Sequence, residues 1–322
     1  MNGIDERLSS MGGVARIRLE SDVVSQAELE DRAGAIVSLL EAFEATLSRF
    51  RADSELSAFN RDPRPALAAS PLLRGLARAA RWAGARSRGL VDATLVSELE
   101  HQGYATSLAG LAPPSLDEAL AAAPPRRPAS AHPGRAYASL RVDDDGRVHR
   151  APGVRLDSGG LGKGLAADLA AATVPLGVRY AIACGGDLAV GGPPGRPWEI
   201  AVTCAHTGGQ AHRLRVGTGG VATSGIHARL WRRADGTFAH HLLDPADGRP
   251  AWTGLVAVTA VASTALEAEV LAKTALLSGP DGARRLLRSS GGVLQHDDGR
   301  VEIIAGLPVV RLRRPVRSGA AA

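Results

Sequence analysis

One apolar stripe along residues 26–50 constrains the fold of this chain more than any other feature. Its members lie alternately four and three residues apart and so share one face of an α-helix: Leu29, Ala33, Ile36, Leu40, Phe43, Leu47 and Phe50. A long helix with a single apolar side must be buried against a large core. The 322 residues supply one, because 45% of them are hydrophobic and 22% charged, an ordinary globular balance.

Two other segments of the first third have the pattern of regular structure. Residues 14–20 alternate apolar and polar side chains, which predicts an opening β-strand. Ser70 and Pro71 form an N-cap and a first-turn proline, and they predict a second helix through about Ser87. We expect both helices to belong to the core, the second through Leu72, Leu73, Leu76 and Trp82.

Residues 110–136 carry six prolines in an Ala-rich stretch, which predicts a surface excursion between two halves of the chain. The second half is richer in short strands. Residues 140–150 and 228–243 each predict a β-hairpin around an Asp-Gly turn. Residues 256–262 predict a strand that leads into a helix from about Ala265 to Leu277.

Composition excludes several classes of protein. No window reaches the roughly 18 apolar residues of a membrane span, and the first ten residues lack the basic and apolar regions of a secretory signal. With only two cysteines, these observations favour a reducing, cytoplasmic setting. The net charge of +5 comes from arginines scattered along the chain, and aromatics are only 3%, which argues against nucleic-acid binding. The only lysines, Lys163 and Lys273, each lie in a motif-like segment.

Residues 155–168 (RLDSGGLGKGLAAD) place a carboxylate, a glycine run and a lysine before a predicted helix. Backbone N–H groups at such a helix start can hold an anion while Lys163 adds a positive charge. The segment is not a phosphate-binding GxxxxGK[ST] loop, because Gly164 replaces the Ser or Thr. An equally good interpretation is a turn whose glycines let the helix pack closely.

Three more segments carry candidate site residues. Gly185-Gly186-Asp187 follows a strand, although a plain hairpin or helix-cap turn has the same pattern. His240 and His241 are adjacent on a predicted strand, so at most one can serve a site while the other is solvated, and each also fits a structural or surface histidine. Glu269 and Lys273 are four residues apart on a helix, which also fits a surface ion pair.

Taken in chain order, these segments resemble the ApbE-like FAD:protein FMN transferases over nearly the whole chain. The motifs that carry the resemblance are Met11-Gly12, the Ser48-Arg49-Phe50 block with Asp53 to Ser57 and Asn60, Val91-Asp92-Ala93-Thr94, Leu156 to Gly164 through Asp168, Gly185-Gly186-Asp187, Thr223-Ser224-Gly225, His241 to Pro245 with Gly248, and Ala268-Glu269.

The resemblance implies a mixed α/β fold with two lobes of sheet and helix and the flavin between them. The implied division is a single domain over residues 1–305, with an N-terminal lobe over about 1–110, the excursion over about 110–136, a C-terminal lobe over about 137–305, and a basic tail over 306–322. It also implies an enzyme that cuts FAD at its pyrophosphate, transfers FMN to a Ser or Thr hydroxyl of an acceptor protein, and releases AMP. An FAD pyrophosphatase and a non-catalytic FAD-binding protein stay open as alternatives.

The same resemblance assigns roles to single residues. FAD would contact Met11, Phe50, Val91, Asp92, Asp157, Lys163 and Leu242. His241 would be the general base, and Lys163 would stabilise the charge that develops on the phosphate. Magnesium would lie between the carbonyl of Gly160 and the side chain of Glu269.

Four positions depart from the family pattern. Glu269 replaces the usual metal-binding Asp, and Lys273 replaces a Thr or Ser ligand one turn later. Gly13 replaces an opening Thr, and Phe50 replaces a Tyr. Because a protonated lysine cannot coordinate a metal, we hypothesise that Lys273 partly replaces the cation and weakens the dependence on added magnesium.

Overall fold

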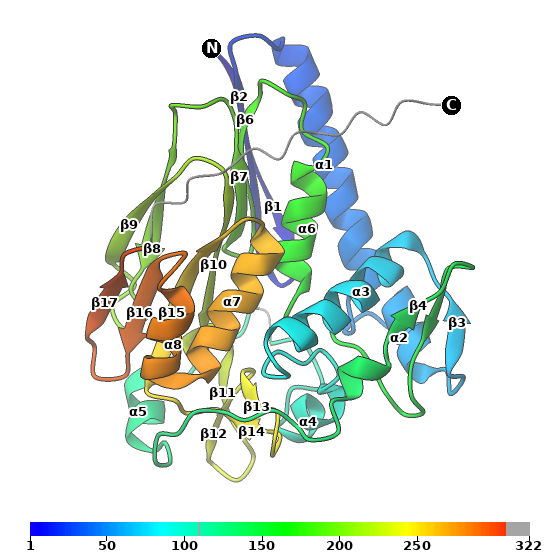
Figure 1. The fold of residues 1–322 in the computed structure, drawn as a ribbon, viewed down its shortest axis with the longest axis vertical. Coiled ribbons are helices and arrows are strands. Elements are labelled where there is room, and N and C mark those ends of the chain that lie inside the picture. The colour runs from blue at the N-terminus through cyan, green and yellow to red at the C-terminus, as the bar shows by residue number, and fades with distance from the viewer. Residues whose placement is uncertain (109, 307–322) are drawn as a thin grey trace.

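The computed structural model describes residues 1–108 and 110–306, and eight of the described strands form one antiparallel sheet, the largest in the fold (Figure 1). In spatial order the strands are β1 (Asn2–Ser10), β2 (Gly13–Ser21), β6 (Arg179–Cys184), β7 (Asp187–Gly191), β10 (Gly219–Gly225), β15 (Leu255–Ala262), β16 (Gly292–His296) and β17 (Val301–Ile304). The two lobes of the sequence division therefore share one sheet. Apart from residue 306, the predicted basic tail lies outside the described residues.

The strand predicted over residues 14–20 is the second strand of the sheet, not the first. It forms a hairpin with β1, which the sequence analysis missed because Ile4 and Leu8 are spaced like one face of a helix. Met11 and Gly12 form the tight turn, with φ angles of 51° and 70°. Two successive positive φ angles are typical of a type I′ turn, so Met11 adopts a conformation that favours Asn or Gly.

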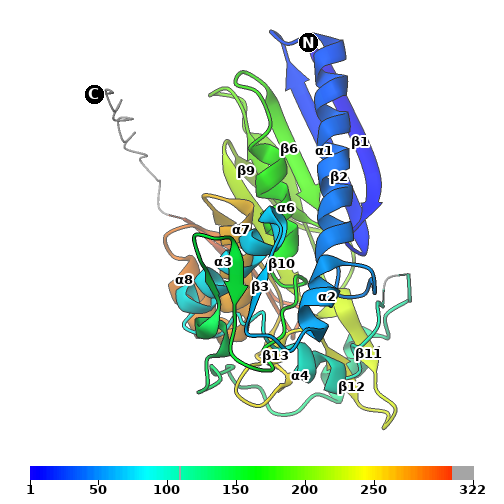
Figure 2. The same cartoon turned by 90° about the vertical axis from the view of Figure 1, so that its right-hand side faces the viewer.

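Helices cover one face of the sheet, and the smaller ones gather at one end of the molecule (Figures 1 and 2). They are α1 (Gln26–Leu47), α2 (Glu55–Arg61), α3 (Pro71–Arg86), α4 (Val96–His101), α5 (Leu116–Ala121), α6 (Gly162–Ala171), α7 (Ala265–Leu277), α8 (Gly279–Leu287), and the 3-10 turns Ala136–Ser139 and Ile226–Arg229. Helix α1 runs along β1 and β2, whereas α6 and α7 lie over the middle of the sheet.

The predicted apolar stripe is confirmed as the buried face of α1 up to Leu47. The helix ends there, and not at Phe50, because Ser48 turns the backbone to an extended conformation. The Ser54 hydroxyl holds this turn by donating to the Ser48 carbonyl at 2.6 Å. Phe50 therefore leaves the core and is 39% exposed. This early helix end is what makes residues 48–50 available to a site.

The second predicted helix is confirmed as α3, with Ser70 as N-cap and Pro71 in the first turn. Leu73 and Leu76 are buried, but the prediction was wrong for Trp82, which is 39% exposed. The sequence analysis also missed the short helix α2, which Ser54 caps.

Smaller sheets surround the main one. Their strands are β3 (Ala66–Ala68), β4 (Arg141–Val142), β5 (Arg147–His149), β8 (Trp198–Thr203), β9 (Gln210–Val216), β11 (Leu230–Arg232), β12 (Phe238–His240), β13 (Leu243–Asp244) and β14 (Arg249–Pro250). The predicted hairpins are confirmed as β4–β5 and β11–β12, and the predicted strand and helix near the C-terminus as β15 and α7. Hairpin β8–β9 packs its apolar side chains on the opposite face of the large sheet.

The proline-rich excursion runs over the surface, but it is tied down at several points. The backbone N–H of Ala129 donates to Leu277 at the end of α7, and that of Arg127 donates to Trp252. Ala119 of α5 is fully buried in the core of α7 and α8. The excursion is thus a packed strap between the halves rather than a free loop.

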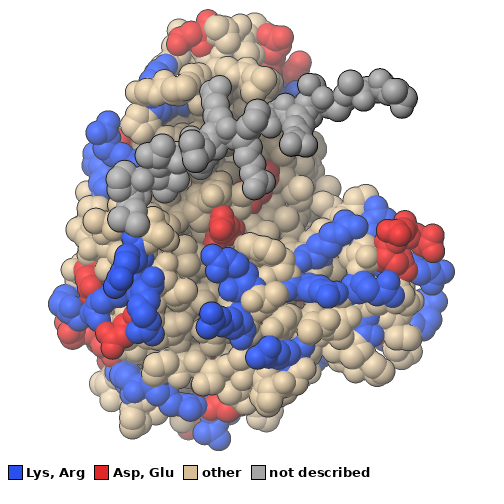
Figure 3. All heavy atoms as spheres, viewed as in Figure 1, with Lys and Arg blue, Asp and Glu red and all other residues tan. Residues whose placement is uncertain are grey.

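The basic side chains do not form one continuous stripe on the face shown in Figure 3, where some of them lie beside acidic ones. Elsewhere in the described residues, ion pairs such as Arg16 with Asp5 and Arg155 with Glu100 also place basic side chains beside acidic ones. Among the described residues, no helix combines the length and the apolar character needed to cross a membrane.

Candidate active site

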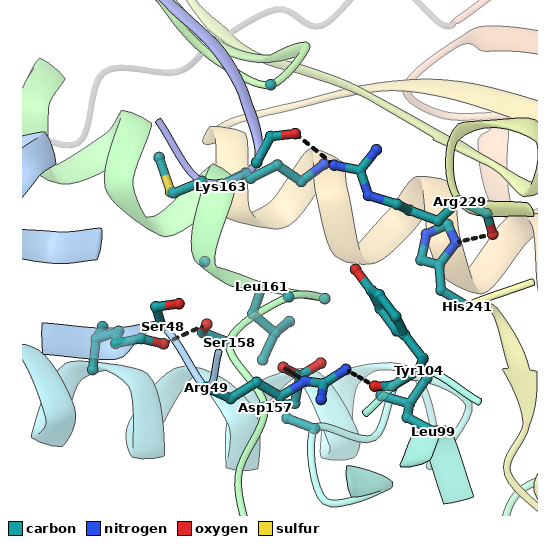
Figure 4. Close-up of a pocket in the computed structure, with 18 of the residues that line it drawn as sticks. Ser48, Arg49, Leu99, Tyr104, Asp157, Ser158, Leu161, Lys163, Arg229 and His241 are labelled. Carbon is teal, nitrogen blue, oxygen red and sulfur yellow. Dashed lines mark hydrogen bonds and ion pairs between the residues drawn. The ribbon is translucent and has the colours of Figure 1, made fainter. Parts of the chain in front are cut away.

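A cavity of about 500 Å³ opens where α1, α6, α7 and the turns below the sheet meet (Figure 4). Nine predicted site residues line it: Met11, Phe50, Val91, Asp92, Asp157, Gly160, Lys163, His241 and Leu242. The tenth, Glu269, lies behind the wall and is only 2% exposed. Sequence segments as far apart as Met11 and Leu242 therefore converge on one place.

The floor of the cavity is the segment 156–161, which leads into α6. The Asn60 side chain clamps it by accepting from the Leu156 N–H and donating to the Leu156 carbonyl, both at 2.8 Å. The Asp157 N–H donates to the Ala93 carbonyl at 2.8 Å, which joins the segment to residues 91–94. The Ser158 hydroxyl donates to the Leu47 carbonyl at 2.7 Å. Three of the motif blocks are thus bonded to one another.

Lys163 extends from the first turn of α6 into the cavity (Figure 4). Its Nζ lies 2.9 Å from Oδ2 of Asp187, which is almost fully buried after the tight Gly185-Gly186 turn. Burial alone would lower the pKa of Lys163, but the carboxylates of Asp187 and Glu269 more than compensate and raise it. Lys163 is therefore a permanent positive charge in the wall of the cavity.

The start of α6 is capped by the protein itself. The Gly164 N–H donates to Oε2 of Glu269 at 2.9 Å, and the Gly162 N–H donates to the Ser158 carbonyl at 2.6 Å. These two backbone donors are consequently used within the chain. They are therefore not available to an anion in the cavity, which narrows the sequence expectation of an anion held by the helix start.

Lys273 lies between the two groups that the resemblance assigned to magnesium. Its Nζ donates to the Gly160 carbonyl at 2.7 Å and lies 3.5 Å from Oε1 of Glu269. The side chain lines the cavity but is only 11% exposed. The predicted pairing of Glu269 with Lys273 is confirmed, although the pair is buried and not on the surface.

Another wall is lined by two aromatic residues, Phe50 and Tyr104, and Trp231 packs against Tyr104. The Tyr104 ring is stacked on Trp231 with centroids 5.3 Å apart and is tilted against Phe50 at 5.4 Å. The guanidinium of Arg49 lies over Phe50, donates to the Tyr104 carbonyl at 2.7 Å and pairs with Asp157 at 3.1 Å. The sequence analysis did not assign Tyr104 to the site. The only feature that could have drawn attention to this residue is that the chain has few aromatic residues.

His241 faces the cavity, as Figure 4 shows, whereas His240 is not among the residues that line it. Only one of the two histidines thus lines the cavity, as their adjacency predicts, but the prediction that the other is solvated was wrong: His240 is fully buried and packs edge-on against Trp252. The Nδ1 of His241 lies 3.4 Å from the Arg229 carbonyl. Burial, followed by the influence of His240, Lys273 and Lys163, lowers the pKa of His241 well below its usual value.

Arg229 is a second residue that sequence analysis did not assign to the site. Its guanidinium lines the cavity and is fixed by donating to the carbonyls of Gly12 and Ala228, at 2.6 and 2.8 Å. Arg229, Lys163 and Lys273 reach the cavity from three distant parts of the sequence. One side of the cavity is therefore cationic and the other is aromatic.

The model of the ApbE family matches residues 11–295 of this chain. The chain belongs to the ApbE family. The resemblance found in the sequence motifs is thereby confirmed. A curated ApbE-family relative from Klebsiella pneumoniae, named FAD:protein FMN transferase, is 29% identical over 280 residues, which cover 83% of this chain and 77% of the relative.

Solved ApbE structures have the same fold. The ApbE protein of Thermotoga maritima superimposes with a TM-score of 0.76 at 25% identity and covers 94% of this chain and 97% of its own. The flavinyl transferase ApbE of Pseudomonas stutzeri gives 0.71 at 25% identity, over 94% and 95%. The predicted class, mixed helices and sheets, is confirmed.

Proposed function

We propose that this chain is an FAD:protein FMN transferase, which moves FMN from FAD to a Ser or Thr hydroxyl of an acceptor protein and releases AMP. The observation that carries the proposal is the convergence of Lys163, Arg229 and His241 in one cavity of about 500 Å³. The names of the curated relatives, FAD:protein FMN transferase, describe the same activity. Cations suit a pyrophosphate, and a neutral histidine suits a hydroxyl nucleophile.

The two sides of the cavity bind different parts of FAD, the donor substrate. The flavin ring packs against the aromatic side, which Phe50 and Tyr104 line together with the Arg49 guanidinium that lies over both rings. The pyrophosphate lies on the cationic side, toward Lys163 and Arg229. The remaining contacts are supplied by the predicted residues Met11, Val91, Asp92, Asp157 and Leu242.

His241 is the general base. The Arg229 carbonyl can only accept a hydrogen bond, so its contact with Nδ1 favours the tautomer with the proton on Nδ1 and a free Nε2. Nε2 takes the proton of the acceptor hydroxyl as its oxygen forms a bond to the FMN phosphorus. The bond from that phosphorus to the bridging oxygen breaks, and AMP leaves with the bridging oxygen and its electron pair.

Lys163 and Arg229 stabilise the negative charge that grows on the leaving AMP. Both groups are held before the substrate arrives, Lys163 by Asp187 and Arg229 by the carbonyls of Gly12 and Ala228. Charges that are already oriented need little reorganisation during the reaction. Loss of one such donor costs about 10²- to 10³-fold in kcat.

The residues present do not fit the magnesium ion that the resemblance implies. Its two expected ligands, Gly160 and Glu269, both face the ammonium of Lys273, at 2.7 and 3.5 Å. An ammonium has no lone pair to offer and repels a divalent cation at such short range. The mechanism therefore uses only groups of this chain.

The test is to incubate the purified chain with FAD and a lysate of its source cells, with and without magnesium. AMP is quantified, and covalent flavin is detected as fluorescence on protein bands in a denaturing gel. Transfer predicts AMP together with fluorescent bands, both lost in His241→Ala and Lys163→Ala. AMP with only free FMN would instead support an FAD pyrophosphatase, and intact bound FAD a non-catalytic binding protein. The acceptor and the cytoplasmic location stay predictions.

A further inference from the structure

We propose that the ammonium of Lys273 is a built-in cation that does the work of a divalent metal on the FAD pyrophosphate, so that this enzyme needs no metal ion. The inference rests on the proposed function and adds the identity of the cation. It makes Lys273 a catalytic residue, in direct contact with the substrate phosphates.

The position of the ammonium is the first argument. Lys273 Nζ donates to the Gly160 carbonyl at 2.7 Å and has Oε1 of Glu269 at 3.5 Å. Oε1 is buried and has no hydrogen-bond partner, so the ammonium is the positive charge that balances it. A carbonyl and a carboxylate around one positive charge are the surroundings that a hard metal ion would require.

The second argument is that the ammonium faces the cavity and not only the protein. Lys273 lines the cavity beside Gly160 and His241. An ammonium has three donor hydrogens. The Gly160 carbonyl and the Glu269 carboxylate engage two of them, which leaves donor capacity for a phosphate oxygen.

The third argument concerns charge. Asp187 and Glu269 lie close to Lys163, and both contribute to raising its pKa. Lys163 alone would leave two carboxylates partly uncompensated behind the pyrophosphate. Lys273 and Arg229 reverse that balance, because together with Lys163 they place three cations on this side of the cavity, opposite Arg49 and Arg51 of the aromatic side. A net positive charge thereby faces the dianionic pyrophosphate, and it comes from groups that cannot dissociate.

A plain structural ion pair is the competing explanation, and two substitutions separate it from the proposal. Lys273→Met keeps the length of the side chain but offers only a thioether, which magnesium disfavours. Lys273→Thr offers a hydroxyl oxygen and leaves room for an ion next to Gly160 and Glu269. A structural role would make both variants equally defective with or without magnesium.

The experiment measures kcat/KM for AMP release from FAD in excess EDTA and in millimolar MgCl₂. We expect the wild-type value to agree within about twofold between the two conditions. The kcat/KM of Lys273→Met is expected to fall ~10- to 100-fold in both conditions, which is the usual contribution of a hydrogen bond to a charged group. Lys273→Thr is expected to lose as much in EDTA and to recover at least ~10-fold with magnesium. The control Arg288→Met removes an exposed positive charge outside the cavity and should change neither value.

Folding is checked separately, because the loss of Lys273 leaves the Glu269 carboxylate without its counter-charge. The double variant Lys273→Met with Glu269→Gln removes both charges, and it should fold and remain insensitive to magnesium. Wild-type activity that EDTA abolishes would overturn the proposal. So would Met and Thr variants whose response to magnesium is the same.

Calorimetry with MgCl₂ alone gives a readout that does not require turnover. The wild type should show no stoichiometric magnesium binding, whereas Lys273→Thr should gain it. If no variant releases AMP or binds FAD, the proposed function fails, yet stoichiometric magnesium binding by the wild type would still overturn the role of Lys273. Its absence, with binding gained in Lys273→Thr, would support that role independently.

Discussion

Asp168 and Glu269 each accept hydrogen bonds from the first turn of the other residue's helix. Asp168 of α6 accepts from the N–H groups of Ala265 and Leu266 at 2.8 and 2.9 Å, and Glu269 of α7 accepts from Gly164 at 2.9 Å. Negative charge at a helix start is favourable, and here both helices use it at once. This reciprocal capping fixes the two helices that carry Lys163 and Lys273.

Asp168→Ala should therefore destabilise the fold. Two backbone donors at the start of α7 lose their partner, which costs about 1–3 kcal/mol in the free energy of unfolding. Denaturant titration measures this value. The control Asp31→Ala removes an exposed carboxylate from α1 and should stay within about 0.5 kcal/mol of the wild type. A loss for Asp168→Ala no larger than that of the control would contradict the capping role.

Gly164 permits the close approach of the same two helices. A Cβ at this position would lie 2.7 Å from the Ala265 carbonyl oxygen and 2.8 Å from the Leu266 Cα, so backbone would have to shift. We expect Gly164→Ala to destabilise the chain by about 1–3 kcal/mol and to lower AMP release, since α6 would move with Lys163.

Gly75→Ala is the matched control for Gly164→Ala. Gly75 also lies in a helix, α3, but nothing lies within 4 Å of a Cβ added there. The general preference of helices for alanine should then stabilise the protein by about 0.5–1 kcal/mol. Thermal unfolding of both variants is the measurement. The same sign of change in the two variants would show that close packing at Gly164 is unimportant.

The parts of the structure that could be predicted are those that residues close together in the sequence specify. Each of three predicted features depends on the pattern of one short segment: the apolar stripe of α1, the Ser70 cap of α3 and the turn of β11–β12. Strand β1 was missed because its conformation depends on pairing with β2, which adjacent side chains do not encode.

The same distinction applies to the site. The glycine run before α6 has two uses that sequence analysis treated as alternatives: it shapes the cavity floor and, at Gly164, admits α7. The spacing of Glu269 and Lys273 predicted their pairing, but the third partner, the Gly160 carbonyl, lies 113 residues earlier. Tyr104 and Arg229 belong to no motif and reach the cavity only through the tertiary fold.

Phe50 should contribute to FAD affinity through its ring. Phe50→Ala removes one face of the aromatic side of the cavity, and we expect the Kd for FAD to rise about 3- to 10-fold, as for a typical aromatic contact. Flavin fluorescence titration measures it. Trp82→Ala is the control, because Trp82 has the same exposure of 39% but does not line the cavity. A Kd that changes equally in both variants would exclude a stacking role for Phe50.

The pH profile of kcat/KM should report the unusual state of His241. Its pKa is lowered by burial and by His240, Lys273 and Lys163, while Tyr104 and Arg229 are its other neighbours in the cavity. A lowered pKa means that the neutral, basic form persists at acid pH. We therefore expect kcat/KM for FAD to stay level as the pH falls through about 6.5, the ordinary pKa of histidine, and to drop only well below it.

Removal of a neighbouring charge tests whether that acid limb belongs to His241. Lys273→Met takes away one of the positive charges that disfavour the imidazolium, so the acid limb should move to higher pH. His241→Ala should remove the limb together with most of the activity, whereas Arg288→Met should leave its position unchanged. A wild-type limb at about pH 6.5 or above would mean that His241 titrates as an ordinary histidine. The cationic surroundings would then not be what keeps the base unprotonated.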